Sequence, residues 1–340
     1  MDENFKLDIR QRPRRMRKSK SILGLCQETY LCKKDLIQPL FVIDQKNKTQ
    51  AIDSMPDQYR LSIDRLLKKC DDLLKNGISS IALFPTLDAK LKDEKASQAV
   101  NENCLFYMAI RSVKKRFPEM TLIADIALDP YTSHGHDGLI DPKTNTIMND
   151  ETVEILTAMS LLCADAGADF VAPSDMMDGR IGAIRENLDE CGFANTAIMA
   201  YSAKYASVFY GPFRDAVKSS SAAGTKNLDK LSYQLNPANS RTAILEAYLD
   251  ESECADVLMV KPAMYYLDIV KAVRERSMLP IAAYQVSGEY SMIKNAASLG
   301  YFDLNKAIYE SLISIKRAGA DMILTYFAEY YAREMAEKFQ

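Results

Sequence analysis

Two lysines that follow short apolar segments have the chemistry to act as amine nucleophiles. Lys204 stands in YSAKY, and Lys261 follows four apolar residues in DVLMVKPAM, with Pro262 directly after it. Because a proline disfavours a helical conformation in the residue before it, Lys261 is expected at the end of an extended segment. Such a lysine can simply point to water, or its amine can lie in a partly buried site and form a Schiff base with a carbonyl compound. The pattern alone leaves both interpretations open.

Schiff-base chemistry places a requirement on the pKa of the amine. At the ordinary lysine pKa of about 10.4, only about 0.04% of the amine is neutral at pH 7. A pKa between roughly 7 and 8 leaves about 10–50% of it neutral. Burial and a second ammonium nearby both lower the pKa of a lysine, so two lysines at one site could activate each other.

Both histidines of the chain lie in the segment ALDPYTSHGHDGL, residues 127–139, which also contains Asp129 and Asp137. Two imidazoles one residue apart among carboxylates are typical of a metal site. We also expect a lid over about residues 211–236, a basic stretch that contains Arg214 and Lys230 and could bind a carboxylate. An ordinary solvated loop would have the same composition.

Eight short apolar segments recur between amphipathic stretches, and these segments are expected to be strands. They cover residues 36–43, 78–84, 120–128, 169–173, 196–202, 256–261, 280–287 and 321–327. Eight strands alternating with helices predict a TIM (β/α)8 barrel. An open doubly wound sheet is the alternative, which the lack of G-x-G-x-x-G after the first segment weakens. Barrel enzymes carry catalytic groups where strands end, which is where the chain has Asp125, Ser174, Lys204, Lys261, Ser287 and Tyr326.

Residues 1–34 are expected to be an N-terminal arm and residues 35–340 the barrel domain. The arm contains the basic stretch RQRPRRMRKSKS, which either is solvated or docks on a neighbouring subunit through arginine–carboxylate pairs. A net charge of −3 argues against a nucleic-acid-binding protein. No run approaches the roughly 18 apolar residues of a membrane span. Seven scattered cysteines and the lack of a signal peptide predict a cytoplasmic protein.

Ten motifs follow one another along nearly the whole chain: RPRRMRKS, DLIQPLFV, MPDQYRLSID, DPYTSHGHDGL, APSDMMDGRIGAIR, YSAKYASVFYGPFRDA, YQLNPANSR, LMVKPAMYYLDIV, YQVSGEY and AGADMILTYF. Together they closely resemble the porphobilinogen synthase (5-aminolevulinate dehydratase) family. The resemblance implies a TIM barrel with an extended N-terminal arm, and a homo-octamer in which the arm wraps a neighbouring subunit. It also implies a lyase that condenses two 5-aminolevulinate molecules to porphobilinogen with loss of two waters, in porphyrin and haem biosynthesis, without an organic cofactor.

The resemblance further implies the roles of individual residues. Lys261 would form a Schiff base with the substrate that becomes the propionate side of the product, and Lys204 with the acetate-side substrate. Asp125 and Ser174 would sit beside these lysines and assist proton transfer.

The resemblance assigns the substrate carboxylates to two groups of residues. Ser287 and Tyr326 would bind the propionate-side carboxylate. The other carboxylate would be bound by Arg214, Gln234 and Lys230, where Lys230 supplies a point charge in place of the more common bidentate arginine. Tyr210 and Tyr284 would line the pocket.

The resemblance also bears on the metal. Zinc-dependent members have three cysteines at positions that are Ala127, Asp129 and Asp137 here. Two carboxylates and a methyl group do not make a soft zinc site, so no catalytic zinc is expected. The aspartate version resembles members that respond to an allosteric magnesium ion at a subunit interface, held largely through waters by a glutamate that corresponds to Glu246.

Two other interpretations were weighed. A Schiff-base aldolase on the same barrel needs only one essential lysine, and the pair Lys204 and Lys261 argues against it. A partner- or nucleic-acid-binding protein that uses the basic arm would leave the polar residues at the strand ends unexplained.

Overall fold

The computed structural model of the chain describes residues 7–219 and 228–337. Eight parallel strands form its centre: β1 (Leu36–Ile43), β4 (Ser80–Thr86), β5 (Thr121–Ile126), β6 (Phe170–Pro173), β7 (Ala197–Lys204), β8 (Val257–Lys261), β9 (Ile281–Gln285) and β10 (Met322–Thr325). Each strand pairs with the next, and β10 returns to pair with β1 through Leu36–Ile323 and Ile37–Leu324. The sheet is therefore closed. The predicted TIM barrel is confirmed, and the open sheet is excluded.

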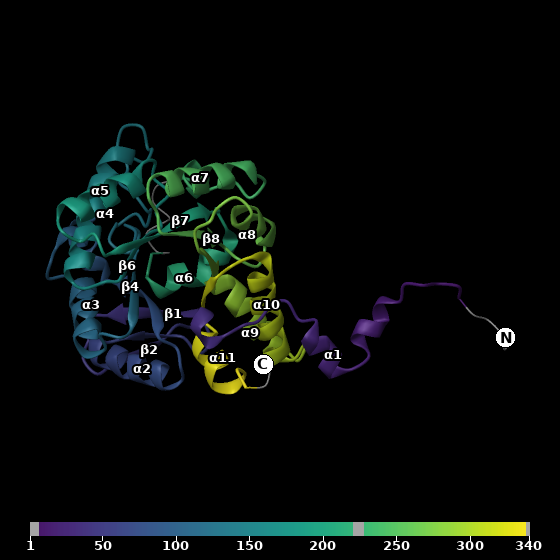
Figure 1. Cartoon of the computed structure of the whole chain (residues 1–340). Coiled ribbons are helices and arrows are strands. Elements are labelled where there is room, and N and C mark those ends of the chain that lie inside the picture. The colour runs from purple at the N-terminus through teal and green to yellow at the C-terminus, as the bar shows by residue number, and fades with distance from the viewer. Residues whose placement is uncertain (1–6, 220–227, 338–340) are drawn as a thin grey trace.

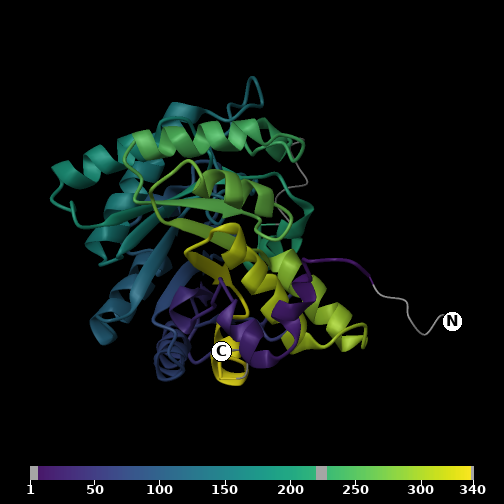
Figure 2. The same cartoon turned by 45° about the vertical axis from the view of Figure 1, so that its right-hand side comes forward.

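Helices surround the barrel and bury the outer faces of its strands (Figures 1 and 2). They are α2 (Ile63–Lys75), α3 (Leu105–Arg116), α4 (Asn149–Asp165), α5 (Arg180–Glu190), α7 (Arg241–Ser252), α8 (Leu267–Arg274), α9 (Ser287–Ser298), α10 (Leu304–Ala318) and α11 (Ala328–Glu334). The short helix α6 (Gly211–Ala216) packs against α9 instead. Because both faces of each strand are covered, every residue of β1 and β8 is buried. This explains why the strands are continuous apolar runs rather than alternating ones. Among the described residues, no helix is long and apolar enough to cross a membrane.

A small hairpin that the sequence did not predict extends the sheet beside β1. Its strands are β2 (Thr49–Ala51) and β3 (Tyr59–Leu61), which pair antiparallel, while β3 pairs parallel with Phe41 and Val42 of β1. The strand β2 is half exposed and only three residues long, so it has no apolar run that would mark it.

The N-terminal segment leaves the barrel and extends away from it (Figure 1). It contains a 3-10 turn, η1 (Pro13–Arg17), and one short helix, α1 (Lys20–Leu25), and neither has a buried residue. Its inner end is attached where the Tyr331 hydroxyl donates a hydrogen bond to the Leu31 carbonyl over 3.1 Å. Residues 1–6 of the predicted arm lie outside the described residues, and its contact with another subunit remains a prediction.

The predicted lid, about residues 211–236, is described at both ends. Its first part is α6, and its last part contains a 3-10 turn, η6 (Lys230–Ser232), while residues 220–227 lie outside the described residues. The Arg60 guanidinium donates hydrogen bonds of 2.6 Å to the carbonyls of Ala216 and Asp215, at the end of α6. This buried arginine fixes α6 against the barrel.

The close contact of α9 with the 3-10 turn η5 (Val208–Tyr210) leads to a stability prediction. A Cβ atom on Gly288 would lie 2.6 Å from the Phe209 carbonyl oxygen and 2.7 Å from its Cα. Because backbone must move to admit it, G288A is expected to lower the free energy of unfolding by about 1–3 kcal/mol. Gly211→Ala is the matched control, since a Cβ there has nothing within 4 Å, and a change within about 0.5 kcal/mol is expected. Equal melting temperatures of the two variants in thermal unfolding would contradict the prediction.

Candidate active site

A cavity opens where the strands of the barrel end, as expected for this fold. Eight of the predicted site residues line it: Asp125, Ser174, Lys204, Tyr210, Arg214, Lys230, Gln234 and Lys261. Asp129, Asp137 and Phe213 complete its lining. Most residues that line the cavity were thus predicted from the sequence, because the pattern locates the strand ends and the cations of the predicted lid. Phe213 carries no such signal and was missed.

The two lysines lie on adjacent strands at the same level of the barrel. Lys204 ends β7 and Lys261 ends β8, and their Cα atoms are partners in the parallel ladder. Each residue is only 5% exposed. The register therefore sends both amines into one cavity, which is the arrangement that mutual activation requires.

Aromatic rings surround the amine of Lys261. Its Nζ lies within 4.7–5.2 Å of the ring centroids of Tyr284, Tyr201, Tyr210 and Phe213. Burial and, after it, the positive charge of Lys204 lower the pKa of Lys261 to about 7, although the nearby carboxylates oppose the shift. Near pH 7, a large fraction of this amine is therefore neutral and nucleophilic.

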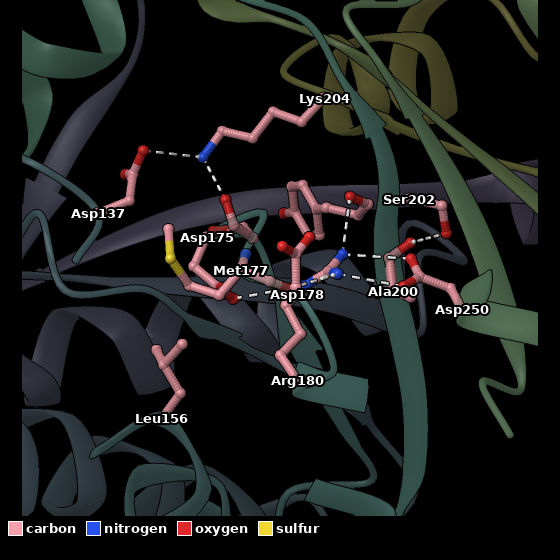
Figure 3. A network of polar contacts seen from close by, with 12 residues as sticks. Asp137, Leu156, Asp175, Met177, Asp178, Arg180, Ala200, Ser202, Lys204 and Asp250 are labelled. Atoms are coloured by element: carbon pink, nitrogen blue, oxygen red, sulfur yellow. Dashed lines mark hydrogen bonds and ion pairs between the residues drawn. The ribbon is translucent and has the colours of Figure 1, made fainter. Parts of the chain in front are cut away.

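Lys204 has polar partners instead of rings. Its Nζ donates a hydrogen bond to the Ser174 carbonyl and lies 3.5 Å from Asp137 Oδ2. Figure 3 shows the side chains of Lys204 and Asp137 pointing toward each other. Its amine is thus held between the loops that follow β5 and β6.

Asp125 is a buried carboxyl group that lines the cavity together with the two lysines. It lies near the end of β5, is 5% exposed, and its Oδ1 has no hydrogen-bond partner among the described residues. Burial raises the pKa of Asp125 to about 7 in spite of the opposing attraction of Lys261. The pKa of this carboxyl group and the pKa of the Lys261 amine therefore both lie near 7.

A buried ion pair positions the loop after β6, which supplies Ser174. Arg180 is 2% exposed and binds both oxygens of Asp250 on α7, at 3.1 and 3.2 Å (Figure 3). Its Nε lies 3.7 Å from Asp175 Oδ2, and its guanidinium also donates to the Met177 carbonyl. These contacts join the loop to α7, and so fix the carbonyl that Lys204 binds. These contacts could not be predicted from the sequence, since Arg180 and Asp250 are far apart in the chain.

Three further predicted residues, Tyr284, Tyr326 and Ser287, lie beside the cavity. The hydroxyls of Tyr284 and Tyr326 are 2.9 Å apart. The Ser287 hydroxyl accepts a hydrogen bond of 2.9 Å from the Phe213 backbone N–H and donates one of 3.2 Å to the Phe209 carbonyl. Ser287 thus ties the lid helix α6 to the start of α9.

Glu289, which the sequence did not identify, joins the loop after Lys261 to the end of β9. Its two oxygens accept hydrogen bonds of 2.8 Å from the backbone N–H groups of Met264 and Val286. Burial raises the pKa of Glu289 to about 7. The segments that carry Lys261 and Ser287 are therefore held together by one buried side chain.

The histidine-containing segment is held by contacts within the protein. His136 Nδ1 lies 3.1 Å from the Tyr233 hydroxyl, and His134 Nδ1 accepts a hydrogen bond from the His136 backbone N–H. Among the described residues, no group of three or more His, Cys, Asp or Glu side chains could hold a metal ion. Asp137 has cationic partners instead.

Glu246 lies outside the cavity, on α7. It is half-buried, and burial raises the pKa of its carboxyl group, an effect that Arg180 opposes and the carboxylates of Asp250 and Asp178 strengthen. The side chain therefore belongs to the region of the Arg180–Asp250 pair rather than to the lysine cavity.

Comparisons with known proteins agree in one family. A family model described as delta-aminolevulinic acid dehydratase matches residues 10–334. A delta-aminolevulinic acid dehydratase of Bradyrhizobium diazoefficiens is 51% identical, over 97% of this chain and 92% of that protein. The corresponding protein of Chlamydia pneumoniae is 48% identical, over 98% of this chain and 99% of that protein.

A solved structure agrees with these relatives. The delta-aminolevulinic acid dehydratase (porphobilinogen synthase) of Toxoplasma gondii, in complex with the reaction product porphobilinogen, superposes with a TM-score of 0.95. It is 48% identical, and the match covers 98% of this chain and 93% of that one.

The effect of Lys204 on Lys261 can be tested through pH dependence. Reductive methylation of Lys261 by formaldehyde and cyanoborohydride is expected to accelerate as pH rises through about 7, because only the neutral amine reacts. K204Q removes a neighbouring positive charge, so the midpoint for Lys261 should move to higher pH. Peptide mass mapping measures the rate at each lysine. K230Q serves as the control and should move the midpoint less, and an unchanged or lower midpoint in K204Q would disprove the interaction.

Proposed function

Because the chain belongs to the delta-aminolevulinic acid dehydratase family, we propose that Lys261 and Lys204 carry the two Schiff bases of its reaction. The activity is that of a porphobilinogen synthase, which condenses two molecules of 5-aminolevulinate to porphobilinogen with loss of two waters, in porphyrin and haem biosynthesis. One observation carries the assignment of the lysines: two buried amines stand at register-paired positions of adjacent strands.

Lys261 is proposed to bind the substrate that becomes the propionate side. A neutral Lys261 amine attacks the ketone carbon, and the ketone oxygen leaves as water, so this residue must be partly unprotonated at working pH. Its pKa near 7 meets that requirement. Lys204 is proposed to react in the same way with the acetate-side substrate, so that the two ketones account for the two waters lost.

The two carboxylates are proposed to bind at opposite sides of the cavity. Ser287 and Tyr326 lie on the side of Lys261, where Tyr284 joins Tyr326 to the rings around the amine. Arg214, Lys230 and Gln234 are proposed to bind the acetate-side carboxylate at the lid end.

Asp125 and Ser174 are proposed to assist proton transfer. The unpartnered oxygen of Asp125 and its pKa near 7 support this role, since the carboxyl can take a proton from one amine and return it to a leaving water. Ser174 is proposed to act beside Lys204, which its carbonyl already binds.

Magnesium is proposed as an allosteric ion held largely through waters by Glu246. Burial is the main cause of the raised pKa of Glu246, and the nearby carboxylates of Asp250, Asp178 and Glu253 add to it against the single opposing charge of Arg180. A divalent cation would relieve this excess of negative charge. Zinc fits the cavity poorly. The position of the first zinc cysteine is Ala127, which offers no ligand, and Asp137 is already paired with two ammonium groups. No catalytic zinc is therefore proposed.

Assembly and compartment are further proposals. We propose a homo-octamer in which the arm contacts a neighbouring subunit. The apolar side chains that the arm exposes support this, including Leu25 at 84% exposure.

A cytoplasmic location is also proposed. Free thiols at all seven cysteines suit a reducing compartment, which supports this location.

Trapping the Schiff bases tests the proposed function. Borohydride reduction in the presence of 5-aminolevulinate is expected to attach substrate to Lys261 and Lys204, which peptide mass mapping would detect. K261M should lower kcat by at least about 1,000-fold, because it removes the nucleophile. Lys271→Met, on the exposed face of α8 and outside the cavity lining, is the control and should retain activity. A protein with no lysine adduct, or an active K261M, would refute the assignment.

Metal exchange tests the magnesium proposal. Zinc-selective chelation is expected to leave activity intact, whereas magnesium removal should lower activity or assembly. E246Q should abolish heat of magnesium binding in calorimetry, because the carboxylate charge is lost, while Glu186→Gln on the exposed face of α5 should preserve it. Stoichiometric zinc in the active enzyme, or unchanged magnesium binding by E246Q, would argue against the proposal.

A further inference from the structure

Asp137 is a buried carboxylate that brings three donors to a single oxygen atom. Its side chain is 2% exposed, and its Oδ2 accepts a hydrogen bond of 3.0 Å from Gln234 Nε2. The same atom lies 3.3 Å from Lys230 Nζ and 3.5 Å from Lys204 Nζ. One carboxylate thus joins the loop after β5 to the lid and to a proposed Schiff-base lysine.

The charge of Asp137 is retained despite its burial. Burial alone would raise the pKa of Asp137, but the ammonium groups of Lys204 and Lys230 outweigh this effect and hold the pKa below its usual range. The cation pairing thus keeps an anion at the lid end of the cavity.

Lys230 and Gln234 are also two of the residues proposed to bind the acetate-side carboxylate. The cavity that contains them has a volume of only about 20 Å³, which is close to the space of a single water molecule. A second carboxylate cannot join the first at the same donors without strong repulsion between like charges in a water-poor site. The incoming carboxylate must therefore take the place of the one already there.

We propose that Asp137 is a positioning residue whose carboxylate occupies the lid donors Lys230 and Gln234 in the free enzyme and exchanges them for the carboxylate of the acetate-side substrate. This inference rests on the proposed function, which assigns those donors to that substrate. After the exchange, Asp137 keeps Lys204 as its partner. A lid cation that is buried without an anion would be strongly destabilising. The exchange avoids this state, because one carboxylate replaces the other.

The exchange also gives the site a means of selection. A ketone that lacks a carboxylate cannot replace Asp137 at Lys230 and Gln234, so the lid donors stay engaged by the protein. A ketone with a carboxylate at the right distance can replace it and release Asp137 from the lid. Asp137 thus competes with the substrate carboxylate for Lys230 and Gln234. Removing the charge of Asp137 should therefore tighten binding of the substrate carboxylate.

A matched pair of ligands measures this competition. The first is 4-oxopentanoate, which keeps the ketone and carboxylate of 5-aminolevulinate and lacks its amine. The second is the methyl ester, which lacks the charge. Borohydride trapping followed by peptide mass mapping gives the half-saturating concentration of each ligand at Lys204. The half-saturating concentration of the ester divided by that of the acid measures the contribution of the carboxylate to binding. A change in the reactivity of the lysine amine affects both ligands and cancels in this ratio.

D137N is expected to raise this ratio at Lys204 about tenfold, while the ratio at Lys261 in the same samples stays within about twofold. D129N is the matched control, because it removes a charge from the same cavity and should raise the ratio at most about threefold. D137S removes the same charge as D137N and carries the test if the asparagine variant does not fold.

The outcomes separate this proposal from the proposed function. A ratio at Lys204 that is unchanged or lower in D137N, or an equal rise in D129N, would overturn the exchange while leaving the Schiff-base assignment intact. Absence of any adduct at Lys204 in the unaltered enzyme would instead overturn the assignment of the acetate-side site, and the exchange with it.

Discussion

Repulsion between two ammonium groups in one water-poor cavity is the constraint on which the rest of the site depends. Lys204 and Lys261 end neighbouring strands in register, so the barrel itself fixes how close the amines lie. In a medium of low dielectric constant, two positive charges at such a distance cannot both persist without compensation. The two lysines differ in their surroundings. Burial favours the neutral form of Lys261, whereas the amine of Lys204 is held by Asp137 and the Ser174 carbonyl.

The surrounding protein must keep the two lysines in these different surroundings. It does so with buried polar side chains as well as with the apolar core. Arg180 joins the loop after β6 to α7 through Asp250, and Glu289 joins the loops after β8 and β9. A buried charge left without its partner is costly, so each of these side chains specifies one arrangement of the loops it connects. The chemistry of the cavity thus depends on residues that line no part of it.

The sequence predicted the barrel well and the cavity in large part. Every strand of the barrel was found because strands buried on both faces read as apolar runs, and the strand ends then located Asp125 and the two lysines. The hairpin β2–β3 was missed, since short half-exposed strands have no such pattern. The pairings of Asp137 could not be predicted either. Its neighbours Lys230 and Gln234 lie some ninety residues away in the chain, and only the folded lid brings them to it.

The last strand to be synthesised closes the barrel, because β10 pairs with β1 through residues near the two ends of the domain. Without that pairing, the strands that carry Lys204 and Lys261 would belong to a sheet with an open edge, and their amines would be open to water. Solvated lysines keep their ordinary protonation and react slowly with carbonyl compounds. The reactivity of the two amines therefore depends on a contact between the first and last strands of the barrel, which carry neither lysine.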